Sequence, residues 1–319
     1  MTAGTAPRRP LCSATSESLR ESAFGSAATA AAWVCLEQSG PWGRVAAVES
    51  HLDTELGRQL DAAASAVGAR FVLVRTPGRH ADDHDGRHER HTVLLACSDV
   101  AHPWLLRGEL SQPQQLASLD VAALVRGDQA AVRASLPDVA LEVDDDPALL
   151  VCTNGRRDLC CAVRGRPVAI EAAARRPGAV WETTHTGGHR YSPTGVLLPT
   201  GQTLGRFDTA LAVSALDAAH SGELAAQLHG PDHDRGLSAL DAPVRAAVSA
   251  VRAAVGEPAL AALTGTAEQK GDEAWLVSVL HADGRTWEVE AARTVLGPDR
   301  PESCVKPAVP QVGWTVRLR

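Results

Sequence analysis

The sequence has few aromatic residues, almost no lysine and no long apolar run. Phe, Trp and Tyr make up only 3% of its 319 residues, and lysine occurs only at Lys270 and Lys306. The Ala-rich segments are interrupted by charged residues or glycine well before the roughly 18 apolar residues that a membrane-spanning helix needs. A net charge of −7 is the wrong sign for a chain that binds nucleic acid. We therefore expect a soluble globular protein with neither nucleic acid nor membrane as a partner.

Cysteine is also scarce, because the chain has only 7, an odd number. Such a count argues against a disulfide framework and favours a reducing, cytoplasmic location. Three cysteines, Cys152, Cys160 and Cys161, fall within ten residues of one another. The other four are scattered: Cys12, Cys35, Cys97 and Cys304. The first residues have no apolar segment typical of a secretory signal, so we predict a disordered tail over 1–25.

What is abundant is aliphatic sequence arranged in two similar series, and it predicts an α/β fold. The first series has strand-like runs at 45–50, 69–76 and 91–98 and helical repeats at 52–67 and 116–136. An acidic, proline-terminated break at 143–147 separates it from the second. The second has strands at 148–153, 179–184 and 195–200 and helices at 167–176 and 207–220. The similar order suggests a weak internal duplication.

The last third of the chain predicts a helix over 241–256 followed by a β-hairpin. The hairpin joins 273–280 to 285–292 through a turn at Asp283 and Gly284. We expect packing rather than chemistry from this region. The domain organisation predicted from these patterns is an N-terminal α/β domain at 26–145, a second domain at 146–235 and an extension at 236–319.

Two loops carry residues suited to metal binding, each directly after a predicted strand. Cys152 and Cys161 are nine residues apart, whereas His185 and His189 are four apart with two glycines between them. Thiolate and imidazole groups bind soft and borderline metals, and glycines let the backbone pass close to an inorganic centre. The two loops therefore predict a four-ligand metal site.

The same histidine spacing occurs elsewhere and is weak evidence by itself. His80, His84 and His88 lie in a polar insert, and His229 and His233 form a further pair. Neither group has nearby cysteines or flanking strands to position it, so we expect these histidines to bind no metal.

The residues alone leave the chemistry of the predicted site open. Two cysteines and two histidines suit iron or structural zinc equally well. The adjacent thiols of Cys160 and Cys161 also allow a thiol-disulfide redox protein, although the Cys-x-x-Cys motif is absent. A glycosidase would need two facing carboxylates, and Glu171 and Glu182 are undistinguished candidates.

The segments CTNGRRDLCCA, WETTHTGGHRYSP and LLPTGQTLGRFD resemble the sucrase/ferredoxin-like family. The resemblance implies that 146–235 is a thioredoxin-like ferredoxin domain, and that 26–145 is a second thioredoxin-like unit. It also implies a [2Fe-2S] cluster bound by Cys152, Cys161, His185 and His189, with Cys160 as the alternative to Cys161. Many relatives have histidine where this chain has Asn154, so no role is carried over to that position.

A cluster of this type implies one-electron transfer rather than catalysis, and nothing in the sequence supports sucrase activity. Neutral imidazole ligands raise the reduction potential above that of an all-cysteine cluster, and their N–H groups allow electron transfer to be coupled to a proton. We also expect positive charge around the cluster that attracts an acidic redox partner protein, as yet unidentified. The residues expected to supply it are Arg156, Arg157, Arg164 and Arg190.

Overall fold

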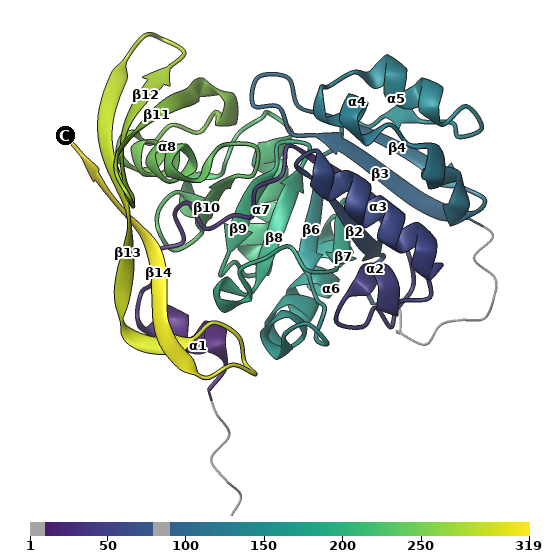
Figure 1. Ribbon diagram of the computed structural model, residues 1–319, viewed down its shortest axis with the longest axis horizontal. Coiled ribbons are helices and arrows are strands. Elements are labelled where there is room, and N and C mark those ends of the chain that lie inside the picture. Colours follow the sequence, from purple (N-terminus) through teal and green to yellow (C-terminus); the bar gives the residue numbers. More distant parts are fainter. Residues whose placement is uncertain (1–9, 79–89) are drawn as a thin grey trace, which may run out of the picture.

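The computed structural model describes residues 10–78 and 90–319 and contains two β-sheets. The larger sheet has ten strands in the order β10-β9-β8-β6-β7-β2-β1-β3-β4-β5, and the smaller has the order β11-β12-β13-β14 (Figure 1). Helices cover the large sheet, which confirms the predicted α/β class. His80, His84 and His88 lie outside the described residues.

The N-terminal half of the large sheet is a β–α–β unit followed by an antiparallel pair. Strands β1 (Ala32–Glu37) and β2 (Ala69–Arg75) are parallel and are connected through helix α3 (Thr54–Ala66). Strand β3 (His91–Cys97) pairs antiparallel with both β1 and β4 (Trp104–Leu110). Helices α4 (Val121–Val125) and α5 (Gln129–Ser135) then lead to the short edge strand β5 (Glu142–Val143).

The second half repeats this order with shorter strands. Strands β6 (Ala148–Cys152) and β7 (Val180–Thr183) are parallel and flank helix α6 (Arg166–Arg175). Strand β8 (Thr194–Leu198) pairs antiparallel with both β6 and β9 (Gln202–Gly205). Helix α7 (Thr209–Ala219) and the edge strand β10 (Asp234–Leu237) complete the unit.

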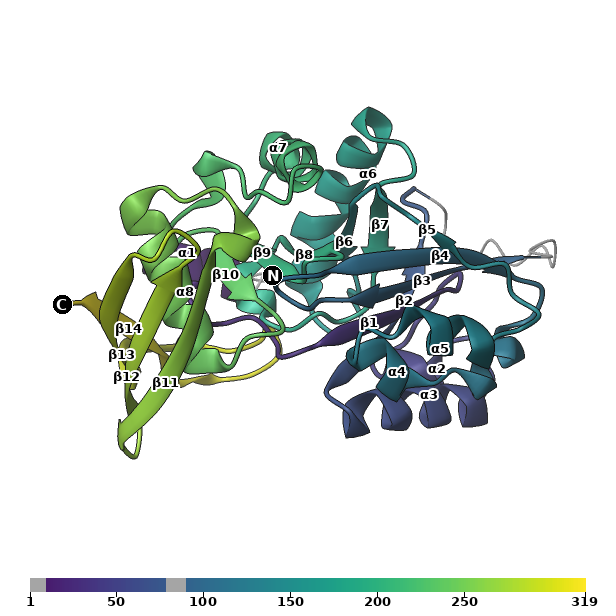
Figure 2. The ribbon, with the colours of Figure 1, turned by 90° about the horizontal axis from the view of Figure 1, so that it is seen from above.

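The two halves meet through antiparallel pairing of β2 with β7. The equivalent strands of the two halves therefore follow each other in mirrored order on either side of this pair. Helices α3, α4 and α5 cover one face of the sheet, whereas α6 and α7 cover the opposite face (Figure 2). Each helical layer has its own apolar core, and a third core contains strand residues of both halves, including Trp33 and Trp181. This repeated topology gives structural support to the duplication suggested by the sequence.

The two halves meet where β2 pairs with β7, and we call this contact the seam. A buried ion pair connects the two strands there. Arg75 donates two hydrogen bonds to one carboxylate oxygen of Glu182, at 2.9 and 2.6 Å, and the Thr153 hydroxyl donates to the same oxygen at 2.9 Å. The Glu182 side chain is fully buried. Its contacts are those of a structural carboxylate, which removes it as a catalytic candidate.

The C-terminal region packs helix α8 (Ala242–Val255) against the four-stranded sheet. The predicted hairpin is present as β12 (Ala274–His281) and β13 (Thr286–Pro301), but it is enclosed by β11 (Leu263–Gly271) and β14 (Ala308–Leu318). The prediction of an isolated hairpin was therefore incomplete. The far ends of β13 and β14 reach helix α1 (Cys12–Ser18), beside the second half of the large sheet (Figure 1).

Three local predictions were wrong. Segment 45–50 forms helix α2 (Ala46–Glu49) instead of a strand, because the Glu49 carboxylate accepts the backbone N–H groups of Arg44 and Val45. Segment 116–136 is divided into α4 and α5, each capped by the side chain of an aspartate. The predicted disordered tail contains α1, whose inner face is buried. No helix among the described residues is long and apolar enough to cross a membrane.

Candidate metal centre

The cysteine loop is folded tightly between β6 and α6. The Asn154 side-chain oxygen accepts the backbone N–H groups of Arg156 and Arg157, which turns the chain back after the strand. A short π-helical turn, Cys161–Gly165, then leads into α6. Gly165 is required here because a Cβ atom would lie only 2.4 Å from the Cys152 carbonyl oxygen. The loop therefore brings Cys161 beside Cys152.

Cys152 is fully buried in a setting that favours its thiolate. Hydrogen bonds from the Cys161 thiol, from His185 and from the backbone N–H of Thr186 hold the pKa of Cys152 well below the usual 9.0. The hydrogen bond to Cys152 raises the pKa of Cys161 correspondingly, and burial adds to that rise. The two thiols therefore titrate as a coupled pair.

The histidine loop follows β7 and turns through two glycines with positive φ. Gly187 and Gly188 have φ of 89° and 68°, and a Cβ on Gly188 would lie 2.1 Å from the Arg235 guanidinium. The turn brings the rings of His185 and His189 to a centroid separation of 5.3 Å, with the planes tilted by 35°. The two glycines therefore place both imidazoles together beside the cysteine loop.

Two arginines that the sequence analysis missed support the histidine loop. Arg235 is fully buried and donates to the Gly187 carbonyl at 3.1 Å and to the Thr194 hydroxyl at 2.6 Å. Burial lowers the pKa of Arg235 to about 9. Arg70, from strand β2 of the other half, donates to the His185 carbonyl at 3.0 Å. No motif surrounds either arginine, so neither could have been found from sequence.

The four predicted ligands offer donor atoms that suit a metal group. The Nδ1 atoms of His185 and His189 are buried and have no hydrogen-bond partner among the described residues. A buried polar atom without a partner is costly, and coordination to a metal would satisfy both nitrogens. The thiols of Cys152 and Cys161 are buried beside them, and two thiolates with two imidazoles are donor types that an iron–sulfur cluster can use.

Cys160 points to different neighbours from those of Cys161. Its sulfur lies 3.3 Å from the Cys12 sulfur and 3.0 Å from the Cys304 sulfur, and the Ser13 hydroxyl donates to it at 3.1 Å. Hydrogen bonds led by that from Cys12 lower the pKa of Cys160 to about 6. Cys12 and Cys304 could not be recognised as neighbours of Cys160 from the sequence, because contacts between distant segments leave no local pattern.

The positive charge that we expected around the cluster is only partly present. Arg164 pairs with Glu17 at 2.7 Å and Arg190 with Glu21 at 2.8 Å, so acidic residues of the N-terminal segment neutralise both. Positive charge is instead found beside His185, where a cavity of about 220 Å³ is lined in part by Arg44, Arg70, Arg157 and Asp61. This cavity reaches a predicted ligand from the surface.

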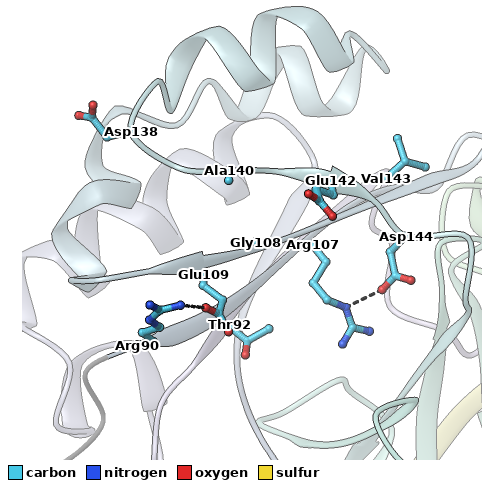
Figure 3. A pocket seen from close by; sticks show the side chains of 10 residues that line it. All are labelled: Arg90, Thr92, Arg107, Gly108, Glu109, Asp138, Ala140, Glu142, Val143 and Asp144. Atoms are coloured by element: carbon cyan, nitrogen blue, oxygen red, sulfur yellow. Dashed lines mark hydrogen bonds and ion pairs between the residues drawn. The ribbon is translucent and has the colours of Figure 1, made fainter.

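A second cavity, of about 680 Å³, lies against β3, β4 and β5 at the edge of the other half (Figure 3). Charged side chains dominate its lining, and two ion pairs cross it, Arg107 with Asp144 at 2.5 Å and Arg90 with Glu109 at 2.7 Å. None of the predicted ligands lines this cavity. The large volume of this cavity is therefore no evidence that it belongs to the metal centre.

In the remaining pair, His229 and His233, each imidazole faces a backbone carbonyl oxygen. A ring nitrogen of His229 lies 3.0 Å from the Leu224 carbonyl oxygen, and one of His233 lies 3.1 Å from the Gly205 carbonyl oxygen. Glu171 is similarly engaged, since its carboxylate accepts the Thr209 hydroxyl at 2.7 Å.

Comparisons with known proteins agree with the resemblance stated from the motifs. A search of curated proteins and a search of solved structures both gave no match. A model of the sucrase/ferredoxin-like family matches residues 23–226, a range that contains both the cysteine loop and the histidine loop. Because this match covers more than half of the chain, the protein belongs to the sucrase/ferredoxin-like family.

Proposed function

We propose that this protein transfers single electrons through a [2Fe-2S] cluster held by Cys152, Cys161, His185 and His189. The observation that carries the proposal is the meeting of two buried thiols with two imidazoles whose Nδ1 atoms have no other partner in the described structure. The family name is consistent with a redox role. When bound, such a cluster supplies one-electron chemistry, at a potential raised by its neutral ligands.

The chain's own residues would fix the ligands and exclude water. Strand β6 and Gly165 hold the two cysteines in a fully buried position, and Arg235 holds the histidine loop. Rigid ligands of this kind reduce the rearrangement that accompanies electron transfer. The proposed role is that of an electron carrier.

His185 offers the route by which electrons would leave the site. It lines the cavity that also contains Arg44, Arg70 and Arg157, with Asp61 as the opposing charge. A partner with an acidic surface would be attracted there, and the rate of electron transfer should fall as salt screens the attraction. Arg157→Glu should lower that rate, whereas Arg133→Glu, on helix α5 of the other half, should leave it unchanged.

Structural zinc bound by the same four residues is the competing assignment. The experiment that separates the two is the visible spectrum of the purified protein with iron, sulfide and zinc analysis. We expect a red-brown protein with about two iron and two sulfide per chain. A colourless protein whose zinc is lost in both Cys152→Ser and His185→Ala would contradict the proposal.

A further inference from the structure

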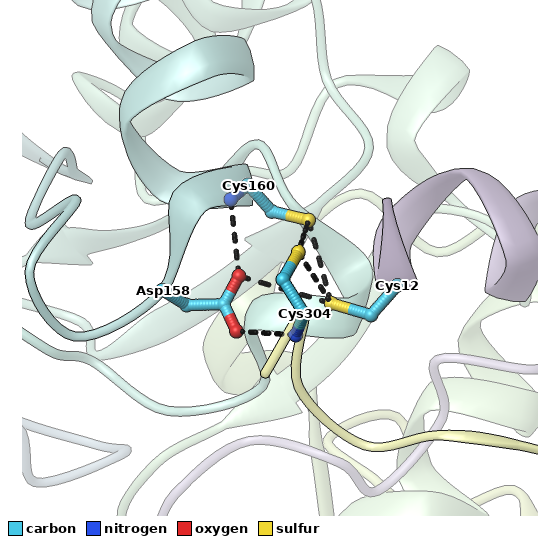
Figure 4. Close-up of side chains that lie close together, drawn as sticks. All are labelled: Cys12, Asp158, Cys160 and Cys304. Atoms are coloured by element: carbon cyan, nitrogen blue, oxygen red, sulfur yellow. Dashed lines mark hydrogen bonds between the residues drawn. The ribbon is translucent and has the colours of Figure 1, made fainter. Parts of the chain in front are cut away.

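A second group of side chains that could hold a metal ion lies next to the proposed cluster and uses none of its four ligands. Cys12 comes from α1, Asp158 and Cys160 from the loop after β6, and Cys304 from the turn between β13 and β14 (Figure 4). Their donor atoms all lie within 4.8 Å of one another. Three segments separated by 144 to 292 residues therefore converge on one point.

The spacing of the sulfurs is close to that of a tetrahedral metal site. The Cys160 sulfur lies 3.3 Å from that of Cys12 and 3.0 Å from that of Cys304, and the sulfurs of Cys12 and Cys304 are 3.7 Å apart. Tetrahedral zinc with Zn–S bonds of about 2.3 Å would place its sulfurs about 3.8 Å apart. A small expansion of this cluster would admit the ion.

The carboxylate of Asp158 supplies the fourth donor and is held in place by the backbone. One of its oxygens accepts the N–H of Cys160 at 3.0 Å, and the other accepts the N–H of Cys304 at 2.9 Å. The first oxygen also lies 3.8 Å from the Cys12 sulfur. Hydrogen bonds of this kind orient ligands in metal sites.

The environment of the sulfurs suits thiolates better than a hydrophobic core. Ser13 donates to the Cys160 sulfur from its hydroxyl at 3.1 Å and from its backbone N–H at 3.5 Å. Cys12 and Cys160 are buried, and Cys304 is only partly exposed. Three thiols packed against one carboxylate repel one another once ionised, and a divalent cation would compensate that repulsion.

We propose that Cys12, Cys160, Cys304 and Asp158 bind one structural zinc ion. Three soft sulfur donors in tetrahedral spacing select zinc over magnesium or calcium, which prefer oxygen ligands. Four protein donors leave no open position for a substrate, which is typical of a structural rather than a catalytic zinc. On binding, the thiols coordinate as thiolates and their protons pass to solvent, with no change of oxidation state.

This zinc would attach helix α1 and the turn between β13 and β14 to the half that carries the proposed iron–sulfur ligands. Helix α1 packs against the 3₁₀ turn that begins at His189, and the His189 Nε2 atom lies 3.8 Å from an Asp158 carboxylate oxygen. The zinc assignment goes beyond the proposed function and does not depend on it. It also explains why two adjacent cysteines are present, since Cys160 and Cys161 would serve different metals.

Metal analysis of the full-length protein and its single variants tests the assignment. We expect about one zinc per chain in the unmodified protein. Cys12→Ser and Cys304→Ser should each lose most of this zinc and retain their iron. Cys97→Ser is the matched control, because Cys97 is a buried cysteine of β3, remote from the cluster in the fold, and should retain both metals.

X-ray absorption at the zinc edge keeps the proposal testable if a variant fails to fold. The unmodified protein should show about three sulfur neighbours near 2.3 Å and one oxygen. A spectrum with two nitrogen neighbours, and zinc that disappears in His185→Ala, would place the zinc at the other site and would contradict both this assignment and the proposed function. A zinc-free protein from zinc-supplemented cells, or a disulfide between Cys160 and Cys304 found by peptide mapping, would refute the second site.

Discussion

The two halves of the large sheet share one topology but differ in the side chains at the ends of their strands. In the N-terminal half β1 ends at Glu37 and β2 at Arg75, whereas in the second half β6 ends at Cys152 and β7 leads to His185. The strand order is the same on both sides of the seam. The fold therefore provides two equivalent pairs of strand ends, and the proposed ligands lie at the pair in the second half.

The two halves also differ in the segment that follows their first strand. After β1 the chain forms helix α2, which packs so closely on α3 that a Cβ on Gly57 would lie 1.7 Å from the Ala47 carbonyl oxygen. After β6 it is Gly165 that makes a close backbone contact, with the carbonyl of Cys152. Tight packing therefore joins two helices in one half and holds a proposed ligand in the other.

The largest expected difference between the halves is iron binding. Cys152→Ser should remove nearly all iron and visible absorbance, because a serine hydroxyl is a poor substitute for a buried thiolate. Cys35→Ser, on the equivalent strand β1, should leave the iron content unchanged. Equal loss of iron in both variants would show that folding, and not ligation, explains the first result.

The seam should be the most sensitive structural point. Glu182→Gln leaves the buried Arg75 without its ionic partner, and we expect a loss of about 3–5 kcal/mol in the free energy of unfolding. Glu109→Gln, in an exposed pair of the N-terminal half, should cost less than about 1 kcal/mol. Denaturant unfolding measures both, and similar values would mean that the seam contributes no special stability.

Glu21 should make the second half sensitive to acid. Burial opposes its ionisation, but the charge of Arg190 and a hydrogen bond from Arg300 hold the pKa of Glu21 below 4.5. Its stabilisation is therefore complete above about pH 4.5 and is lost as the pH falls through the lower, folded-state pKa.

Glu21→Gln should lower stability at pH 7 by about 3 kcal/mol and reduce the dependence of stability on pH below 4.5. Unfolding measured between pH 3 and pH 7 tests this. An acid dependence that is unchanged in the variant would assign the acid sensitivity to other carboxylates.

Alanine substitutions at Gly165 and Gly57 should distinguish a general loss of stability from a change in ligand geometry. Gly165→Ala and Gly57→Ala both introduce a clash with backbone, and each should cost about 1–3 kcal/mol of stability. Only Gly165→Ala should also shift the visible spectrum and lower the iron content. Normal iron in a folded Gly165→Ala protein would show that this contact does not position Cys152.

The smallest expected effect is the pH dependence of the reduction potential. An imidazole bound to a metal through one nitrogen keeps an N–H on the other, and added negative charge on reduction favours that proton. The potential should therefore fall as the pH rises, by at most about 59 mV per pH unit. His189→Cys should lower the potential and flatten the slope. A potential independent of pH in the unmodified protein would contradict the coupling.

The sequence predicted local features better than long-range ones. The helix at 52–67, strands β2 and β3, and the α6, α7 and α8 segments were recognisable because each has a clear periodicity and end signals. Strand β1 was missed because it directly follows an alanine-rich run and has no polar alternation. Only two strands of the four-stranded C-terminal sheet were predicted, as a hairpin, because only the turn at Gly284 has a recognisable sequence signal.

The same limit applies to the site. Cys152, Cys161, His185 and His189 could be proposed because they form short motifs, and their joint role as ligands stays a prediction. The structure shows that Cys152 contacts Cys161 and His185 and that the two imidazole rings are neighbours. Cys12 and Cys304 could not be found, since only the fold brings them to Cys160.

Pulsed electron paramagnetic resonance of the reduced protein tests the central claim most directly. We predict a signal coupled to nitrogen nuclei of two histidines, which changes on ¹⁵N labelling of histidine and loses one coupling each in His185→Ala and His189→Ala. A reduced cluster with no histidine nitrogen coupling would contradict the account, because it would place the cluster on other ligands.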